Sequence, residues 1–306
     1  MIITDHAYNF RCRMCGSCCR SGWRINVEKN IAEKLLDLAD YDIYIKENLR
    51  LIQSDGLTPH FDRKGCGLIS ADNLCYLHSN YGVDYLGSTC LSYPKKFIRT
   101  NEGLFCGLSY SCPAAADTLN TYVSGVKNLQ ENEFDNIPQI ISFVETDENL
   151  TRLENRIIQI ILNKNGNNLN LLLEIGENFD YKPESVIIME SGNFKKIKKL
   201  LKTVIEESFV GVNKVNQFSN DTQLYISCCE VSFRNYTLNY YLLKSFYEYR
   251  GMPTDTYVIL LFIYHLASFV IESEEDIAGF YSEIDRLLFH TPQVSKKLIA
   301  TLTDYY

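Results

Sequence analysis

The chain has 306 residues, of which 46% are hydrophobic and 22% are charged, a balance that argues against disorder and allows one or two domains. Its net charge of −8 argues against a non-specific nucleic-acid-binding protein, because phosphate contacts need clustered lysines and arginines. The same charge favours a basic partner, such as a lysine-bearing protein surface.

Polar side chains interrupt any apolar run at the start of the chain: Asp5, His6, Asn9, Arg11 and Arg13. A secretion signal needs such a run, so we expect a cytoplasmic protein. The reducing cytoplasm disfavours structural disulfides. The eleven cysteines therefore favour metal binding or redox chemistry.

Nine of the eleven cysteines precede Pro113, and core packing explains one or two buried cysteines but not nine. Thiolates are soft ligands that suit zinc and iron–sulfur clusters. Gly16 and Ser17 would let the chain turn tightly within the first group of thiols. We therefore predict a metal site, with these ligands: Cys12, Cys15, Cys18, Cys19, Cys66, Cys75, Cys90 and Cys112.

Two kinds of metal centre suit these thiols, namely two tetrahedral zinc ions or one 4Fe-4S cluster with thiols left over. The spacing differs from the usual ferredoxin run. It also lacks the Cys-x3-Cys-x2-Cys pattern of radical S-adenosylmethionine enzymes, because Cys15 and Cys19 would require a cysteine where the chain has Gly22. We favour the iron–sulfur cluster and keep zinc as the alternative.

The remaining cysteines and one histidine need separate interpretations. Cys106 lies in an alternating apolar pattern, so it is either a ligand or a core residue. Cys112 precedes a predicted helix, whose N-terminus should lower the pKa of its thiol. His78 follows Cys75 at metal-ligand spacing, but a surface histidine is favoured. For the pair Cys228-Cys229 we favour core packing.

The predicted elements of the first half begin with a helix in which Ile31, Leu35 and Leu38 recur at helical spacing. Residues 97–108 predict a β-hairpin, because two β-prone runs flank Asn101-Glu102-Gly103. A helix follows, with Ser111 or Cys112 as its cap and Pro113 at its first position.

The second half predicts helices only. A polar run near residues 126–136 suggests a division into a cysteine-rich region, 1–126, and a helical region, 127–306. Within the helical region, Asn163 to Asn170 suggests a loop, and one apolar stripe joins Leu224, Cys228, Val231, Leu238, Leu242 and Phe246. Tyr257 to Ile271 contains His265 and Ser268 and is short for a membrane span, so it predicts a buried helix. Ile284, Leu287 and Leu288 predict a further, amphipathic helix. The expected fold is mainly α, with a small hairpin.

One segment invites comparison with a nucleotide-binding fold. Leu171 to Gly176 resembles the first strand and loop of a Rossmann-type methyltransferase. Because Glu177-Asn178-Phe179 follows, the further glycines that such a loop needs are missing. We therefore predict a helix that ends near Gly176, and no Rossmann domain.

Residues 10–120 contain an ordered series of motifs that resembles two related bacterial families. It starts with Phe10-x-Cys12-x2-Cys15-Gly16-x-Cys18-Cys19 and Gly22-Trp23-Arg24-Ile25, continues through Cys66-Gly67-Leu68-Ile69, Cys75, Gly82, Leu86 and Thr89-Cys90-x2-Tyr93-Pro94-Lys95, and ends in Leu108-Ser109-x2-Ser111-Cys112-Pro113-x-Ala115-Ala116. One family comprises zinc- or iron-chelating cysteine-cluster domains. The other is the flagellin lysine-N-methylase (FliB) family, to which the Gly22-Trp23 and Cys112-Pro113 elements are more similar.

The resemblance implies methylation of flagellin lysines, with S-adenosylmethionine as the methyl donor and a cysteine-bound iron–sulfur cluster. It also implies that Trp23 and Tyr93 lie at the cofactor site, with the ring of Trp23 beside the metal centre. The chain departs from the family pattern at Lys95, Ala114 and Asp117. These departures leave the catalytic residues unassigned and leave room for another peptide substrate.

Two other functions stay open. One is a non-catalytic metal-binding or electron-transfer module that assists a partner protein, with the helical part as its docking surface. The other is a redox enzyme that modifies peptides. Neither nucleic acid nor membrane is an expected partner. If the protein uses S-adenosylmethionine, it must bind the donor outside a Rossmann fold, near the cluster.

Overall fold

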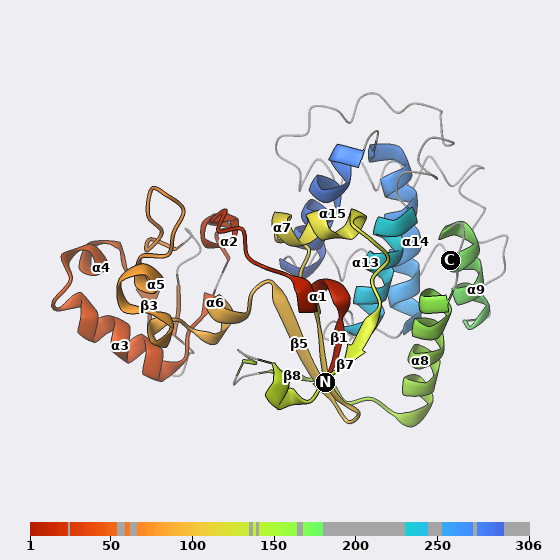
Figure 1. The fold of residues 1–306 in the computed structure, drawn as a ribbon, viewed down its shortest axis with the longest axis horizontal. Coiled ribbons are helices and arrows are strands. Elements are labelled where there is room, and N and C mark those ends of the chain that lie inside the picture. The colour runs from red at the N-terminus through yellow and green to blue at the C-terminus, as the bar shows by residue number, and fades with distance from the viewer. Residues whose placement is uncertain are drawn as a thin grey trace.

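The computed structural model describes residues 1–23, 25–53, 59–61, 66–134, 137–138, 141–163, 168–179, 230–243, 253–271 and 274–290. Helices predominate among them, so the mainly α expectation is confirmed. Figure 1 shows two parts, each with its own hydrophobic core: a small lobe built around α3, α4 and α5, and a larger body in which helices cover a sheet.

The sheet of the body is built around the predicted hairpin. Strands β5 (Lys95–Thr100) and β6 (Gly103–Leu108) pair antiparallel, with Phe97 opposite Cys106 and Thr100 opposite Gly103. Three shorter strands extend the pair into a five-stranded sheet, in the order β7-β1-β6-β5-β8. They are β1 (Ile2–Thr4), β7 (Val126–Asn128) and β8 (Ser142–Phe143).

We expected the hairpin to stand alone and region 127–306 to contain helices only. Both expectations were wrong, because the hairpin is part of a five-stranded sheet and two of its short strands reach into region 127–306. β7 crosses residue 126 and pairs with β1, while β8 lies beside β5. Strands of two or three residues carry no periodic pattern of their own. They form because the exposed edge of a neighbouring strand offers unpaired backbone groups.

The helices of the body were predicted more closely. They are α1 (Asp5–Asn9), α7 (Pro113–Ala116), α8 (Glu148–Asn163), α9 (Asn168–Glu177), α13 (Glu230–Leu242), α14 (Pro253–Val270) and α15 (Glu274–His290). Gly176 lies near the end of α9, as predicted. Helix α14 covers the predicted buried run up to Val270, and the described side chains of the run are buried. None of the described helices is both long and apolar enough to cross a membrane.

Helix α13 differs from the predicted amphipathic stripe, because Ser232 to Leu242 are buried on every side. Several of its polar side chains form hydrogen bonds with other segments of the body. Asn235 accepts a hydrogen bond from the backbone N–H of Ser124 and donates to the carbonyls of Leu119 and Tyr122. The predicted stripe residues Leu224, Cys228 and Phe246 lie outside the described residues, as do 164–167 of the predicted Asn-rich loop.

The lobe joins short helices and a small sheet. Its helices are α3 (Lys29–Ala39), α4 (Ile43–Asn48) and α5 (Tyr76–Tyr81), and its strands are β2 (Ile25–Asn26), β3 (Leu51–Ile52) and β4 (His60–Phe61). Asp42 caps α4 and accepts hydrogen bonds from the hydroxyls of Tyr76 at 2.9 Å and Tyr81 at 2.6 Å. These bonds fix α5 against α4, and so fix the residue that precedes α5, Cys75.

Candidate metal centre

Cysteines from separate segments lie near the junction of the lobe and the body. Helix α2 (Ser17–Arg20) carries Cys18 and Cys19, and α6 (Ser88–Ser92) carries Cys90; both helices lie between the two parts in Figure 1. The backbone N–H of Cys66 donates to the carbonyl of Cys19 at 2.6 Å. Cys75 is the N-cap residue of α5 and pairs with Ile69 in a β-bridge.

The thiols of Cys18 and Cys19 are 3.9 Å apart and share a hydrogen bond. This bond lowers the pKa of Cys18 to about 6 and raises the pKa of Cys19, because the proton stays on one sulfur while the other carries the charge. Charges on Cys66 and Cys90 raise the pKa of Cys19 further. Several thiols therefore lie within electrostatic reach of this pair.

The thiols of Cys66 and Cys90 are also coupled electrostatically to their neighbours. Burial raises the pKa of Cys66, and the charges of Cys75 and Cys18 add to the increase. Cys90 is accessible to solvent, yet the surrounding protein desolvates its thiol and, together with the charges of Cys66 and Cys75, raises its pKa to about 12. We call Cys18, Cys19, Cys66, Cys75 and Cys90 the thiol cluster.

The donor chemistry of the thiol cluster suits a thiolate-ligated metal. Thiolates that repel one another are stabilised by a cation between them, and zinc and iron–sulfur centres bind this donor type. The separation of Cys18 and Cys19 Sγ, 3.9 Å, is close to the roughly 3.8 Å between two sulfurs of a tetrahedral zinc site with 2.3 Å bonds. Over the described ranges, however, no three His, Cys, Asp or Glu side chains form a group that could hold a metal ion. The residues fit the group chemically, and metal binding would have to draw them together.

Two further predicted ligands, Cys12 and Cys15, are exposed on the loop before α2. Gly16 turns this loop with a φ of +69°, and a Cβ there would lie 2.6 Å from the side chain of Ile69. Arg20 donates to the carbonyl of Cys15 at 2.7 Å and to the side chain of Asn73 at 2.6 Å. The first cysteines are thus held beside the turn that precedes Cys75, in agreement with the tight turn expected at Gly16.

Cys112 is the N-cap residue of α7, and Pro113 occupies the first helical position, as predicted. The predicted lowering of its pKa was wrong: burial raises the pKa of Cys112 to about 11. Backbone N–H groups of Ala115 and Ala114 oppose the increase, but a helix of four residues has too small a dipole to outweigh desolvation.

Of the remaining candidates, Cys106 lies in the core and His78 lies on the surface. Cys106 is fully buried in the sheet, which favours its interpretation as a core residue. Burial raises the pKa of its thiol to about 12. His78 is exposed on α5, as the sequence favoured. Cys228 and Cys229 lie outside the described residues.

The two aromatic residues expected at the cofactor site are in contact. The rings of Trp23 and Tyr93 lie 5.5 Å apart, edge to face. Tyr93 directly follows α6, and burial raises the pKa of its hydroxyl, with charges of Cys112, Asp285 and Cys18 acting in the same direction. The pair is therefore within electrostatic reach of the thiols. Arg24 lies outside the described residues.

A chain of hydrogen bonds leads from Tyr93 into the core. The Tyr93 hydroxyl bonds the Ser111 hydroxyl at 3.1 Å, which bonds the Ser109 hydroxyl at 2.6 Å. The Ser109 hydroxyl and the backbone N–H of Ser111 both donate to Asp285, at 3.0 and 2.7 Å. The Tyr240 hydroxyl donates to the other carboxylate oxygen at 2.8 Å. The network connects a half-buried aromatic pair to a buried carboxylate on α15.

Asp285 was missed in the sequence, although a signal was present. It shares the buried face of α15 with Tyr281, Ile284 and Leu288, at helical spacing. A carboxylate at such a position must find partners, because an unpaired buried charge is strongly disfavoured. Burial raises the pKa of Asp285 to about 6, while the donors from Tyr240, Ser111 and Ser109 lower it.

The pKa of Asp285 predicts how stability depends on pH. The folded protein binds the proton more tightly than the unfolded chain, so the free energy of unfolding should fall by about 2 kcal/mol as pH rises from 4 to 6, and level off near pH 7. Nearby Tyr240, Tyr236 and Tyr110 have raised pKa values and stay neutral there, so they add nothing to this slope.

Urea unfolding at a series of pH values measures this slope. Asp285→Asn keeps the shape of the side chain and should remove the slope between pH 4 and 6. Glu275→Gln, on the exposed face of the same helix, should leave it unchanged. An unaltered slope in the Asp285 variant would assign the titration to another group.

Comparison of the chain with protein-family models, curated proteins and solved structures found no match.

Proposed function

We propose that this protein is an iron–sulfur protein lysine N-methyltransferase that acts on flagellin, with S-adenosylmethionine as the methyl donor. The resemblance of residues 10–120 to the flagellin lysine-N-methylase family motivates the proposal. The observation that carries it is the position of Trp23 and Tyr93, which contact each other within electrostatic reach of Cys18 and Cys112.

The proposed metal ligands are the thiol cluster, with Cys12, Cys15 and Cys112 as the further thiols of the set. A bound iron–sulfur cluster would supply redox capacity and would cross-link the segments that carry its ligands. The described residues supply the rest of the site: Arg20 positions the first loop, and Tyr93 begins the hydrogen-bond chain to Asp285.

Lysine methylation requires a neutral amine, whereas the free ammonium has a pKa of about 10.4. The site must therefore take up a proton. In this proposal the Tyr93 oxygen accepts the proton from the ammonium group while the Tyr93 hydroxyl proton passes to Ser111, the Ser111 proton to Ser109 and the Ser109 proton to Asp285. A carboxylate whose pKa is about 6 is ionised near neutral pH and can act as the final acceptor.

The test is incubation of anaerobically purified protein with radiolabelled S-adenosylmethionine and flagellin from the same organism. Label on lysine side chains is the expected result. Tyr93→Phe keeps the ring contact with Trp23 and removes the proton route, so kcat should fall by roughly a hundredfold or more. Tyr41→Phe, at a residue that is 89% exposed, is the matched control and should retain full activity. Cluster-loaded protein that transfers no label would contradict the proposal.

A second candidate is an electron-transfer or metal-binding module for a partner protein. The exposure of Cys12, Cys15 and Cys90 favours it, because a centre near the surface can exchange electrons with a docked protein. Under this alternative the loaded protein would show a reversible reduction potential and no methyl transfer. Labelled methyl groups on lysine would exclude it as the sole function.

A further inference from the structure

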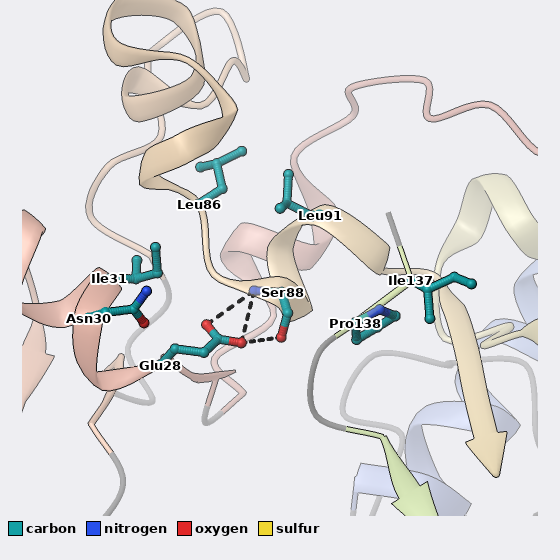
Figure 2. Close-up of a pocket in the computed structure, with 8 residues that line it drawn as sticks. All are labelled: Glu28, Asn30, Ile31, Leu86, Ser88, Leu91, Ile137 and Pro138. Carbon is teal, nitrogen blue, oxygen red and sulfur yellow. Dashed lines mark hydrogen bonds between the residues drawn. The ribbon is translucent and has the colours of Figure 1, made fainter. Parts of the chain in front are cut away.

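A small pocket lies where the lobe meets the body, beside the helix that carries Cys90 (Figure 2). Its volume is about 220 Å³. Pockets for drug-sized ligands measure roughly 300–1,000 Å³, so this one suits a single side chain better than a nucleoside. Its apolar walls are Ile31, Leu86, Leu91, Ile137 and Pro138.

Glu28 is the charged residue of this pocket, and Figure 2 shows its carboxylate directed toward Ser88. The backbone N–H of Ser88 lies 3.2 Å from both carboxylate oxygens, and the Ser88 hydroxyl donates to one of them. Gly87 allows this approach, since a Cβ there would lie 3.1 Å from the other oxygen. These bonds fix the carboxylate at the start of α3.

The charge of Glu28 has no cationic partner in the part of the chain that the structure describes. A carboxylate offers about four acceptor positions, so the bonds from Ser88 leave space for another donor. Its charge also reaches the thiol cluster, since it contributes to the raised pKa of Cys90. The pocket thus combines aliphatic walls and the side chain of Asn30 with a fixed carboxylate that has no cationic partner among the described residues.

We propose that this pocket binds a lysine side chain of a protein partner. Aliphatic walls would cover the four-carbon stem, and Glu28 would accept a charge-assisted hydrogen bond from the ammonium group. An arginine fits less well, because its planar fork needs two free carboxylate oxygens and the Ser88 N–H already lies between them. The net charge of −8 favours the approach of a lysine-bearing surface. Only the identification of this lysine as the methyl acceptor rests on the proposed function.

Fluorescence anisotropy with a labelled lysine peptide and its norleucine counterpart tests the inference without any substitution. The two peptides share the aliphatic stem and differ in the charge. The lysine peptide should bind at least roughly tenfold more tightly, the factor expected of a charged hydrogen bond. Equal binding of the two peptides would overturn the proposal.

Glu28→Gln locates the binding site. It keeps the size of the side chain and an acceptor for Ser88, so circular dichroism should stay unchanged while lysine-peptide affinity falls by roughly tenfold or more. Glu33→Gln, exposed on the same helix, should bind as the unmodified protein does. Unchanged affinity in the Glu28 variant, or displacement of the peptide by adenosine, would overturn the assignment of the pocket.

The same variants separate this inference from the proposed methylation. Lysine-specific binding that depends on Glu28, with no methyl transfer, would support the pocket and contradict the methyltransferase. Methyl transfer whose KM is unaffected by Glu28→Gln would support the methyltransferase and place its lysine elsewhere.

Discussion

Protein with Cys18→Ser or Cys90→Ser is expected to lose its metal and much of its soluble yield. The two thiols lie on separate helices, α2 and α6, and the charge of Cys18 raises the pKa of both Cys66 and Cys90. A metal that joins these segments contributes its binding free energy to folding, so loss of a ligand destabilises the whole junction. Iron, zinc and sulfide analysis of anaerobic protein measures the effect, with the cluster absorbance at roughly 400 nm as a second readout.

Cys106→Ser is the matched control, because Cys106 is fully buried in the sheet and apart from the thiol cluster. It should retain the metal and reduce the free energy of unfolding by about 1–3 kcal/mol. Metal retention in the Cys18 variant, or metal loss in the Cys106 variant, would contradict the division between ligand and core cysteines. Zinc without sulfide in the unmodified protein would contradict the iron–sulfur assignment but leave the metal site in place.

Asn239→Leu should reduce the free energy of unfolding by roughly 3–5 kcal/mol. The Asn239 side chain donates to the carbonyl of Leu108 and accepts from its N–H, both at 2.8 Å and both buried. Leucine would leave two buried backbone groups without partners, and each such group costs about 1–3 kcal/mol. Urea unfolding followed by far-ultraviolet circular dichroism measures the loss.

Asn149→Leu is the control for this substitution, since Asn149 is exposed in the first turn of α8. It should change the free energy of unfolding by less than about 0.5 kcal/mol. A loss below about 1 kcal/mol in the Asn239 variant would mean that water or another side chain replaces the amide. In the unmodified protein the amide packs closely against β6, since a Cβ at Gly107 would lie 2.3 Å from the Asn239 oxygen.

Local patterns were enough to predict the elements that lie close together in the chain. The spacing of Ile31, Leu35 and Leu38 predicted α3, and the turn at Asn101-Glu102 predicted the β5–β6 pair. Pro113 marked the first residue of α7. Each of these features depends on neighbours within about one or two turns, so the sequence by itself determines them. The density of cysteines before Pro113 is likewise a local feature, and the metal site that it predicts stays a prediction.

Features that join distant segments were decided by the tertiary structure. Asp285 meets Ser111 across 174 positions of the chain, and Asn239 meets Leu108 across 131. Neither partner can be read from a local period. The pKa of Cys112 follows the same rule: its place at a helix start was visible in the sequence, but the burial that raises the pKa comes from other segments. Sequence thus determined where the thiols lie along the chain, while packing determined how near their charges lie to one another and which hydroxyls connect Tyr93 to Asp285. The physical reason is that desolvation and electrostatic coupling depend on distances that the fold alone sets.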